Sequence, residues 1–233
     1  MTTAIILAAG TDRRFGMDIP KQFVNVNNRP LVVYTLERFE HHEQIDEIIV
    51  ACLDGWQELV RAYATQFGIS KLKNIITGGR NAQESTHKVL QFMKDTHDVN
   101  DIVVIHDSIR PLVTDEIITR SIDECKKNGM GVAATNVMDN IMRSDNKHDG
   151  NVSIDRDEIM KIQTPQTFRY GYISDIHERA VREGIVGFWD NSSLLTNLGE
   201  KVHFSEGSGR NHKINTVDDL ELFKVIYKMT QEE

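Results

Sequence analysis

The stretch Ala4–Phe23, AIILAAGTDRRFGMDIPKQF, contains the features that decide the fold. It opens with the short aliphatic run Ala4–Leu7, which does not alternate with polar residues and is typical of a parallel strand buried on both faces. Gly10 then interrupts the run, and three cations follow it, Arg13, Arg14 and Lys21. Because a glycine after a strand lets backbone N–H groups turn toward a phosphate, this loop predicts an anion site. A surface loop with solvated cations is the alternative.

The composition limits the classes of function to consider. The chain has 233 residues, of which 39% are hydrophobic and 27% charged, as expected for a single globular domain spanning residues 1–233. A formal charge of −8 and a pI of about 5.6 argue against nonspecific binding to nucleic acid or to a membrane surface. The first loop concentrates cations in a chain whose net charge is negative, so these cations indicate a small anionic ligand.

Cysteine usage and hydropathy indicate where the protein works. The two cysteines, Cys52 and Cys125, lack the spacing of a metal or redox pair and are expected to be reduced structural thiols. No apolar run approaches the roughly 20 residues that a membrane span requires. Met1 leads directly into the first strand, so no signal peptide is expected and the cytoplasm is the expected location.

Strand-like and helix-like segments alternate beyond the first strand. Strands are expected over residues 45–53, 74–77, 101–106 and 131–135, and helices over residues 31–39, 56–67, 84–94 and 114–128. Short loops between such segments predict an α/β fold with a doubly wound, mostly parallel, Rossmann-like sheet. Ligands bind beyond the carboxyl ends of the strands in these sheets. The loops 10–21, 78–85 and 107–111 are therefore expected to converge on one crevice.

The pattern changes over residues 136–168. A polar, turn-rich centre at 144–150 separates two β-like segments there, which predicts a hairpin or a β-arm that leaves the domain. Beyond it we expect helices over residues 172–183, 192–198 and 217–229, and a strand over residues 201–205.

Five blocks of sequence together carry a family resemblance. They are LAAG with Arg14 and PKQF, then GGRNAQES, HDSIRP, IDRDEIMKIQTPQTF and NHKINTVDDL. In this order they resemble the cytidylyltransferases that activate alditol phosphates, within the nucleotidyltransferase superfamily. Two branches are similar to this chain: the 2-C-methyl-D-erythritol 4-phosphate cytidylyltransferases of isoprenoid synthesis, and the ribitol-5-phosphate cytidylyltransferases of teichoic-acid and capsule synthesis. The resemblance covers nearly the whole chain.

The resemblance implies an enzyme that transfers CMP from CTP to an alditol phosphate, with Mg²⁺ as cofactor. The backbone of the first loop would bind the triphosphate, through Ala8, Ala9, Gly10 and Gly16. Arg14, Lys21 and Lys213 would stabilise the charge on the reacting phosphoryl group and on pyrophosphate. Gly79 and Ser85 would contact the cytosine edge, and Asp107 would lie by the ribose and the metal.

The resemblance also implies a binding site for the alditol phosphate and a homodimer. Arg110, Asn140 and Thr164 would lie near the acceptor. A β-arm within 136–168 would cross to a neighbouring subunit and bring Arg156 to its acceptor. Because an alditol phosphate is already an anionic nucleophile at neutral pH, the reaction needs positioning and cations rather than a side chain that acts as a base.

Each of these residues also has a plainer interpretation. Asp107 follows a strand, where an aspartate often caps the next turn. Lys213 alone resembles a surface lysine, and Arg156 lies in the charged run DRDE, where it could form a solvated ion pair. His106 is expected to pack or to form hydrogen bonds rather than to act in catalysis.

Three departures from the family pattern leave the substrate open. Asp12 stands where a small residue is usual, Ala82 where an arginine is frequent (with Arg80 nearby), and Asn140 where a threonine contacts the alditol. We expect ribitol 5-phosphate as the acceptor, with 2-C-methyl-D-erythritol 4-phosphate as the alternative. A different class of protein, an inactive homologue that binds nucleotide, would also fit Asp12 and Asn140. The retained Arg14, Lys21, Asp107 and Lys213 favour an enzyme, since a pure binder has no need of groups that act on the transition state.

Overall fold

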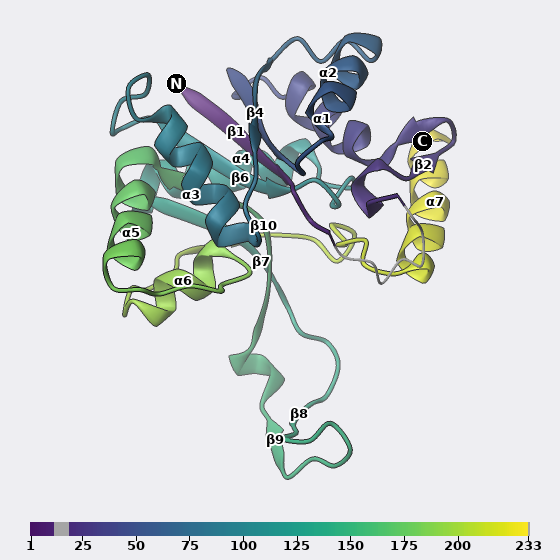
Figure 1. Ribbon diagram of the computed structural model, residues 1–233. Helices are drawn as coiled ribbons and strands as arrows, with labels where there is room; N and C mark the ends of the chain where they lie inside the picture. Colours follow the sequence, from purple (N-terminus) through teal and green to yellow (C-terminus); the bar gives the residue numbers. More distant parts are fainter. Residues whose placement is uncertain (12–18, 233) are drawn as a thin grey trace.

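A seven-stranded sheet forms the centre of the computed structural model, which describes residues 1–11 and 19–232. The strands follow the order β11-β7-β10-β6-β1-β4-β5. They span β1 (Thr2–Ala8), β4 (Glu47–Cys52), β5 (Leu72–Thr77), β6 (Ile102–Asp107), β7 (Met130–Asn136), β10 (Met160–Arg169) and β11 (Phe204–Glu206). β10 runs antiparallel to β6 and β7, whereas the other pairings are parallel. The mostly parallel sheet predicted from the sequence is therefore confirmed (Figure 1).

Helices cover both faces of this sheet. They are α1 (Leu31–His41), α2 (Gln57–Gln66), α3 (Ala82–Met93), α4 (Asp115–Asn128), α5 (Tyr170–Arg182), α6 (Asn191–Asn197) and α7 (Val217–Glu232). One buried cluster joins the sheet to α1, α2 and α4, and a second joins its other face to α3, α5 and α6. Figure 1 shows α3, α5 and α6 together on one side of the strands.

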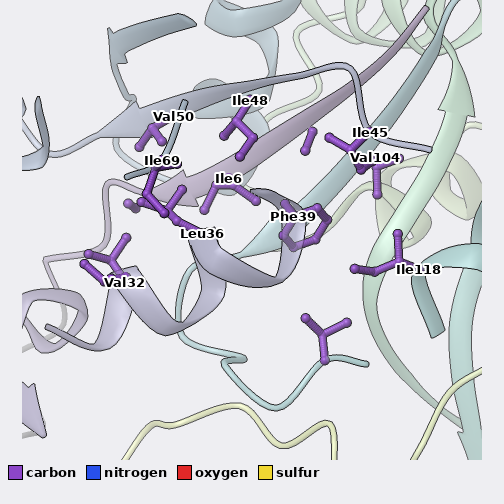
Figure 2. Packing of buried hydrophobic residues seen from close by; sticks show 14 of the residues in the cluster. Ile6, Val32, Leu36, Phe39, Ile45, Ile48, Val50, Ile69, Val104 and Ile118 are labelled. Atoms are coloured by element: carbon purple, nitrogen blue, oxygen red, sulfur yellow. The ribbon is translucent and has the colours of Figure 1, made fainter. Parts of the chain in front are cut away.

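The two clusters meet on β1, where successive side chains point to opposite faces. Ile6 belongs to the first cluster and Ile5 to the second, and both are fully buried. α1 presents Val32, Leu36 and Phe39 to the first cluster, at the spacing that places residues on one helix face (Figure 2). Burial of each such side chain contributes about 1.5–3 kcal/mol. β1 is thereby fixed from both sides, and the loop that follows it starts from a rigid strand.

The two cysteines are buried in the core and are not bonded to each other. Burial raises the pKa of the Cys52 thiol to about 12 and that of Cys125 to about 11, so both stay protonated at neutral pH. Their expected structural role fits this environment. Across residues 1–11 and 19–232, none of the helices has the length and apolar character needed to cross a membrane.

The segment between β7 and β10 leaves the body of the molecule. β8 (Ile141–Arg143) and β9 (Val152–Ile154) form a separate two-stranded antiparallel sheet, followed by the short 3-10 helix η2 (Arg156–Glu158). Figure 1 shows this hairpin extending away from the central sheet. Its part in dimerisation stays a prediction.

The sequence pattern grouped residues up to 168 with the arm, but residues 160–169 form β10, a strand inside the central sheet. The pairing of β10 with β7 shifts register between Ile162 and Gln166. This irregularity surrounds Pro165, which has no N–H group to donate to the ladder.

The end of the chain returns to the first loop. α7 packs its Phe223 and Leu220 against Leu31 and Tyr34 of α1, and the ring centroids of Tyr34 and Phe223 lie 5.1 Å apart. The 3-10 helix η1 (Lys21–Phe23) and the small hairpin of β2 (Asn25–Val26) and β3 (Arg29–Pro30) lie between β1 and α1. α7 thus holds the segment before it, which contains Lys213, close to the loop after β1.

Candidate active site

A cavity of about 400 Å³ lies beyond the carboxyl ends of β1, β5 and β6. The segments after these three strands line it together with a segment near the end of the chain. The lining residues are Leu7, Ala9, Gly10, Thr11, Lys21, Gln22, Gly79, Arg80, Asn81, Ala82, Ser85, Asp107, Ser108, Ile109, Trp189, Lys213 and Asn215. The convergence of the three loops on one crevice, as predicted from the sequence, is confirmed.

The described part of the first loop is held in place by Gln22. The buried carboxamide of Gln22 donates from Nε2 to the carbonyl oxygens of Ala8 and Gly10, at 2.9 and 3.0 Å. Lys21 is 5% exposed and donates from Nζ to Oδ1 of Asn215 at 2.9 Å. The predicted triphosphate contacts Arg14 and Gly16, and the unusual Asp12, lie outside the described residues.

The second loop approaches the first so closely that it requires glycine. A Cβ on Gly78 would collide with the Cβ of Ala9 in the first loop, whereas one on Gly79 would collide with the side chain of Glu84 in α3. Ser85 accepts a hydrogen bond from the N–H of Gly79 at 2.9 Å and donates one to the carbonyl oxygen of Asn81 at 2.8 Å. The two residues predicted to contact the cytosine edge are therefore bonded to each other at the wall of the cavity.

α3 begins at this wall. Asn81 caps the helix by accepting from the N–H of Glu84 at 2.8 Å, and both Asn81 and Ala82 line the cavity. The positive end of the helix dipole therefore borders a cavity suited to an anion. Arg80, the arginine near Ala82, is 90% exposed in its side chain and is paired with Glu84 at 3.0 Å.

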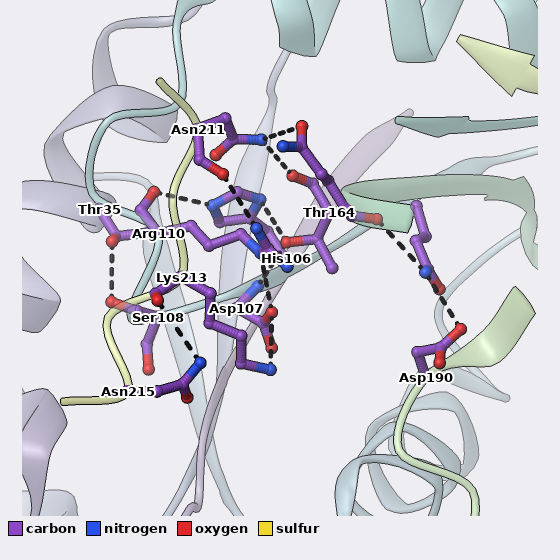
Figure 3. Close-up of polar contacts among 12 residues, drawn as sticks. Thr35, His106, Asp107, Ser108, Arg110, Thr164, Asp190, Asn211, Lys213 and Asn215 are labelled. Atoms are coloured by element: carbon purple, nitrogen blue, oxygen red, sulfur yellow. Dashed lines mark hydrogen bonds and ion pairs between the residues drawn. The ribbon is translucent and has the colours of Figure 1, made fainter. Parts of the chain in front are cut away.

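Two cations from distant parts of the chain meet at Asp107, the last residue of β6. Lys213 Nζ and Arg110 Nε each lie 3.0 Å from Oδ2 of Asp107 (Figure 3). Burial alone would raise the pKa of this carboxyl group, but Lys213 and Arg110 outweigh burial and hold the pKa well below its ordinary value. Asp107 is therefore ionised at neutral pH.

His106 and Thr164 fix the backbone on which Asp107 stands. Nε2 of His106 lies 3.2 Å from the carbonyl oxygen of Arg110, which can only accept, so Nε2 carries the proton. Nδ1 then accepts from Oγ1 of Thr164 at 3.0 Å, and the same oxygen accepts from the N–H of Asp107 at 3.1 Å. Burial lowers the pKa of His106 to about 4, so the ring is neutral at neutral pH. The prediction that His106 forms hydrogen bonds fits this arrangement.

The segment that contains Lys213 is anchored to the loop after β6. The N–H of Ile214 donates to the carbonyl oxygen of Ile109 at 2.9 Å, and Nη1 of Arg110 donates to the carbonyl oxygen of Asn211 at 2.9 Å. Asn211 is fully buried and donates from Nδ2 to the carbonyl oxygen of Thr164 at 2.8 Å. The sequence pattern singled out only Lys213 in NHKINTVDDL, yet Asn211 and Asn215 hold that lysine in place.

A second cavity of about 150 Å³ adjoins the first, and the two share Leu7, Asp107, Trp189 and Lys213. The predicted acceptor residues Arg110 and Thr164 line it. Most of its remaining lining residues have side chains that can form hydrogen bonds. These remaining residues are Ile105, Ile162, Gln163, Gln166, Asp190 and Asn191. Trp189 was not predicted from the sequence, because nothing in the local pattern separates it from a core aromatic.

Two predicted acceptor residues lie apart from these cavities. Asn140 and Arg156 are exposed on the segment that carries the hairpin, and neither lines either cavity. Nη1 of Arg156 donates to the carbonyl oxygen of Met138 at 2.7 Å, within the same segment. Within one chain the structure therefore does not bring these two side chains to Asp107.

The side chains of the described residues do not form a metal site made of protein ligands alone. Over residues 1–11 and 19–232, no group of three or more His, Cys, Asp or Glu side chains is placed to hold an ion. Mg²⁺ commonly binds through one or two carboxylates together with substrate phosphates. The single carboxylate of Asp107, at the meeting point of the two cavities, is the residue that suits such a site.

Comparisons with known proteins find relatives that match nearly the whole chain. A family model described as 2-C-methyl-D-erythritol 4-phosphate cytidylyltransferase (IspD) matches residues 2–229. A ribitol-5-phosphate cytidylyltransferase of Lacticaseibacillus paracasei is 39% identical over 96% of this chain and 97% of that protein. A 2-C-methyl-D-erythritol 4-phosphate cytidylyltransferase of Clostridium botulinum is 34% identical over 98% of both.

Solved structures give the same result for the fold. The crystal structure of the 2-C-methyl-D-erythritol 4-phosphate cytidylyltransferase of Francisella tularensis has a TM-score of 0.79 to this chain at 27% identity, covering 95% of this chain and 97% of that one. A 4-diphosphocytidyl-2C-methyl-D-erythritol synthase from Anaerococcus prevotii has a TM-score of 0.81 at 24% identity, covering 98% and 96%.

Proposed function

The chain belongs to the 2-C-methyl-D-erythritol 4-phosphate cytidylyltransferase (IspD) family, and from this premise we propose that it transfers CMP from CTP to ribitol 5-phosphate. The acceptor is proposed from the relative in Lacticaseibacillus paracasei, which is a ribitol-5-phosphate cytidylyltransferase. 2-C-methyl-D-erythritol 4-phosphate is the second candidate, because relatives that bear this activity in their names are 34–35% identical. Both candidates share the same chemistry.

One observation carries the proposal: Lys21, Asp107 and Lys213, which lie far apart in the sequence, line a single cavity at the carboxyl ends of the strands. The ammonium group of Lys213 pairs with the carboxylate of Asp107, and the ammonium group of Lys21 donates a hydrogen bond to Asn215. A cleft built in this way suits two anionic reactants, since cations held in place need no reorganisation when charge moves.

The reaction needs alignment more than activation. A phosphate oxygen of the acceptor attacks the α-phosphorus of CTP and forms a new P–O bond. The bond from the α-phosphorus to the oxygen that leads to the β-phosphorus breaks, and pyrophosphate leaves with the electron pair. In our proposal the loop after β1 and the start of α3 bind the nucleotide, while Lys21 and Lys213 offset the negative charge that develops on the leaving group.

Asp107 is the residue that would hold Mg²⁺ together with phosphate oxygens of the nucleotide. The bound ion would supply positive charge beside the triphosphate. Asp107 also pairs with Lys213 and Arg110, so it fixes the positions of these two cations.

We further propose that the protein acts as a homodimer, in which the hairpin carries Arg156 and Asn140 to the acceptor cavity of the partner subunit. Their exposure on an extended segment supports this part of the proposal.

A turnover assay tests the function. Purified protein is incubated with CTP, Mg²⁺ and one of three acceptors: ribitol 5-phosphate, 2-C-methyl-D-erythritol 4-phosphate or glycerol 3-phosphate. Released pyrophosphate is measured and the CDP-alditol product is identified by mass spectrometry. We expect the highest kcat/KM with ribitol 5-phosphate. A higher value with 2-C-methyl-D-erythritol 4-phosphate would reassign the acceptor, and no pyrophosphate with any acceptor would refute the proposed activity and leave the nucleotide-binding homologue.

A further inference from the structure

Trp189 is an exposed aromatic side chain at the point where the two cavities meet. It lines both cavities together with Leu7, Asp107 and Lys213, yet its side chain is 78% exposed. The residues predicted to contact the cytosine edge, Gly79 and Ser85, line only the larger cavity. The position of Trp189 therefore coincides with the place where the acceptor has to reach the nucleotide.

The backbone that carries Trp189 is fixed on both sides. On one side, buried Gln83 of α3 donates to the carbonyl oxygen of Ile185 at 2.7 Å and accepts from the N–H of Phe188 at 3.1 Å. On the other side, Asp190 caps α6 by accepting from the N–H of Ser193 at 3.0 Å. The backbone on either side of Trp189 is therefore anchored by hydrogen bonds within the protein.

The polar side of the smaller cavity complements this aromatic. Gln163 and Gln166 of β10 and Asn191 of α6 place carboxamides along it. Each already makes a bond within the protein, Gln163 to Ser208, Gln166 to the N–H of Asn191, and Asn191 to His177. The N–H groups and lone pairs that these bonds leave over match the hydroxyl groups of a polyol chain, because a carboxamide has two donors and two acceptor positions. The carbon side of such a chain presents C–H groups, which pack against an aromatic face and remove it from water.

We propose that Trp189 is a specificity-determining residue whose indole packs on the carbon chain of the acceptor while the carboxamides of Gln163, Gln166 and Asn191 bind its hydroxyl groups. This inference rests on the proposed function and names the part of the acceptor that the protein recognises besides its phosphate. The indole is the apolar wall of the polyol site and contacts the substrate directly.

Kinetics of three variants test the assignment, with Trp189→Ala and Trp189→Phe compared with Val186→Ala. Val186 is the matched control, because it lies on the same loop, is 75% exposed and lines neither cavity. We expect Trp189→Ala to raise KM for ribitol 5-phosphate about tenfold, with KM for CTP unchanged. Trp189→Phe should recover most of the loss, and Val186→Ala should match the wild type.

Fluorescence gives a readout that a structural role alone would not produce. The chain has two tryptophans, so subtracting the Trp189→Phe spectrum from the wild-type spectrum isolates Trp189 from Trp56. CDP-ribitol should shift this emission to shorter wavelength, whereas CDP, which lacks the ribitol chain, should not. An equal shift with CDP, or a change in KM for CTP alone, would mean that the indole stacks on cytosine and would overturn the proposal.

The two proposals fail in different ways. An inactive wild type would refute the proposed function. An active wild type with unchanged acceptor KM in Trp189→Ala would refute the role of Trp189 and leave the proposed function intact.

Discussion

Replacing Lys213 with methionine tests the link between charge in the cavity and catalysis. The change removes the ammonium group that lies 3.0 Å from Oδ2 of Asp107 while it keeps a side chain of similar length. The loss of one preorganised charge that acts on the transition state lowers kcat by about 10²–10³-fold. We expect a fall in kcat of this size, measured as pyrophosphate release at saturating CTP and acceptor.

The same substitution should destabilise the fold only slightly. A hydrogen bond to a charged group contributes about 1.5–3 kcal/mol. The side chain of Lys213 is 35% exposed, so solvent screens its pairing, and Arg110 remains 3.0 Å from the same carboxylate oxygen. We therefore expect the free energy of unfolding to fall by about 1 kcal/mol, measured by urea denaturation followed by circular dichroism.

The pH dependence of stability gives a second, independent check. Burial opposes ionisation of Asp107, but Lys213 and Arg110 lower its pKa below the ordinary value of about 4. This pairing stabilises the folded state above that ordinary value, and the stabilisation is lost as pH falls toward the lower pKa of the folded state. Without Lys213 the pKa of Asp107 in the folded state is higher, so acid unfolding should begin at a higher pH.

Lys224→Met is the matched control, since Lys224 is a 40% exposed lysine of α7 that pairs with Glu221 and does not line the cavity. A folded Lys213→Met variant with unchanged kcat would refute the proposed role of the charge. If acid unfolding of the variant began at the same pH as in the wild type, Lys213 would not set the pKa of Asp107.

Three further substitutions address other parts of the site. Lys21→Ala should lower kcat by about 10²–10³-fold, with the circular dichroism spectrum unchanged, and a wild-type kcat would remove Lys21 from the reaction. Arg156→Ala should raise KM for the alditol phosphate and leave KM for CTP alone. Mixing it with Lys21→Ala subunits should restore part of the activity, and no recovery would argue against a site shared between subunits. Thr164→Val leaves the N–H of Asp107 and Nδ1 of His106 without their partner, so the free energy of unfolding should fall by about 2 kcal/mol in urea. An unchanged stability would mean that water replaces the hydroxyl group.

The central fold could be predicted from the sequence because its signals are local. Buried aliphatic runs such as Ile5 and Ile6 in β1, and the helical spacing of Leu36 and Phe39 in α1, each indicate an element without knowledge of the rest. The rule that ligands bind beyond the carboxyl ends of parallel strands then placed the three loops together. This part of the prediction needed no distant contact.

The remaining features depend on long-range contacts, which have no local signal. β10 is a central strand, but its sequence IQTPQTF is polar because Gln163, Thr164 and Gln166 face partners from distant segments. Trp189 could equally have been a core aromatic, and only the structure shows it exposed beside two cavities. The lysine at 213 could be predicted only through the family resemblance, since its approach to Asp107 spans most of the chain.

The position of Lys213 after the last strand of the sheet has a consequence for shortened chains. All seven strands of the sheet lie before residue 207, so a chain that stops at Glu206 would contain every strand of the scaffold. It still lacks Lys213, Asn215 and the helix that covers Leu31 and Tyr34. We therefore expect a chain shortened to residue 206 to be inactive and to expose the apolar side chains of Leu31 and Tyr34, which makes it a target for chaperones and proteases.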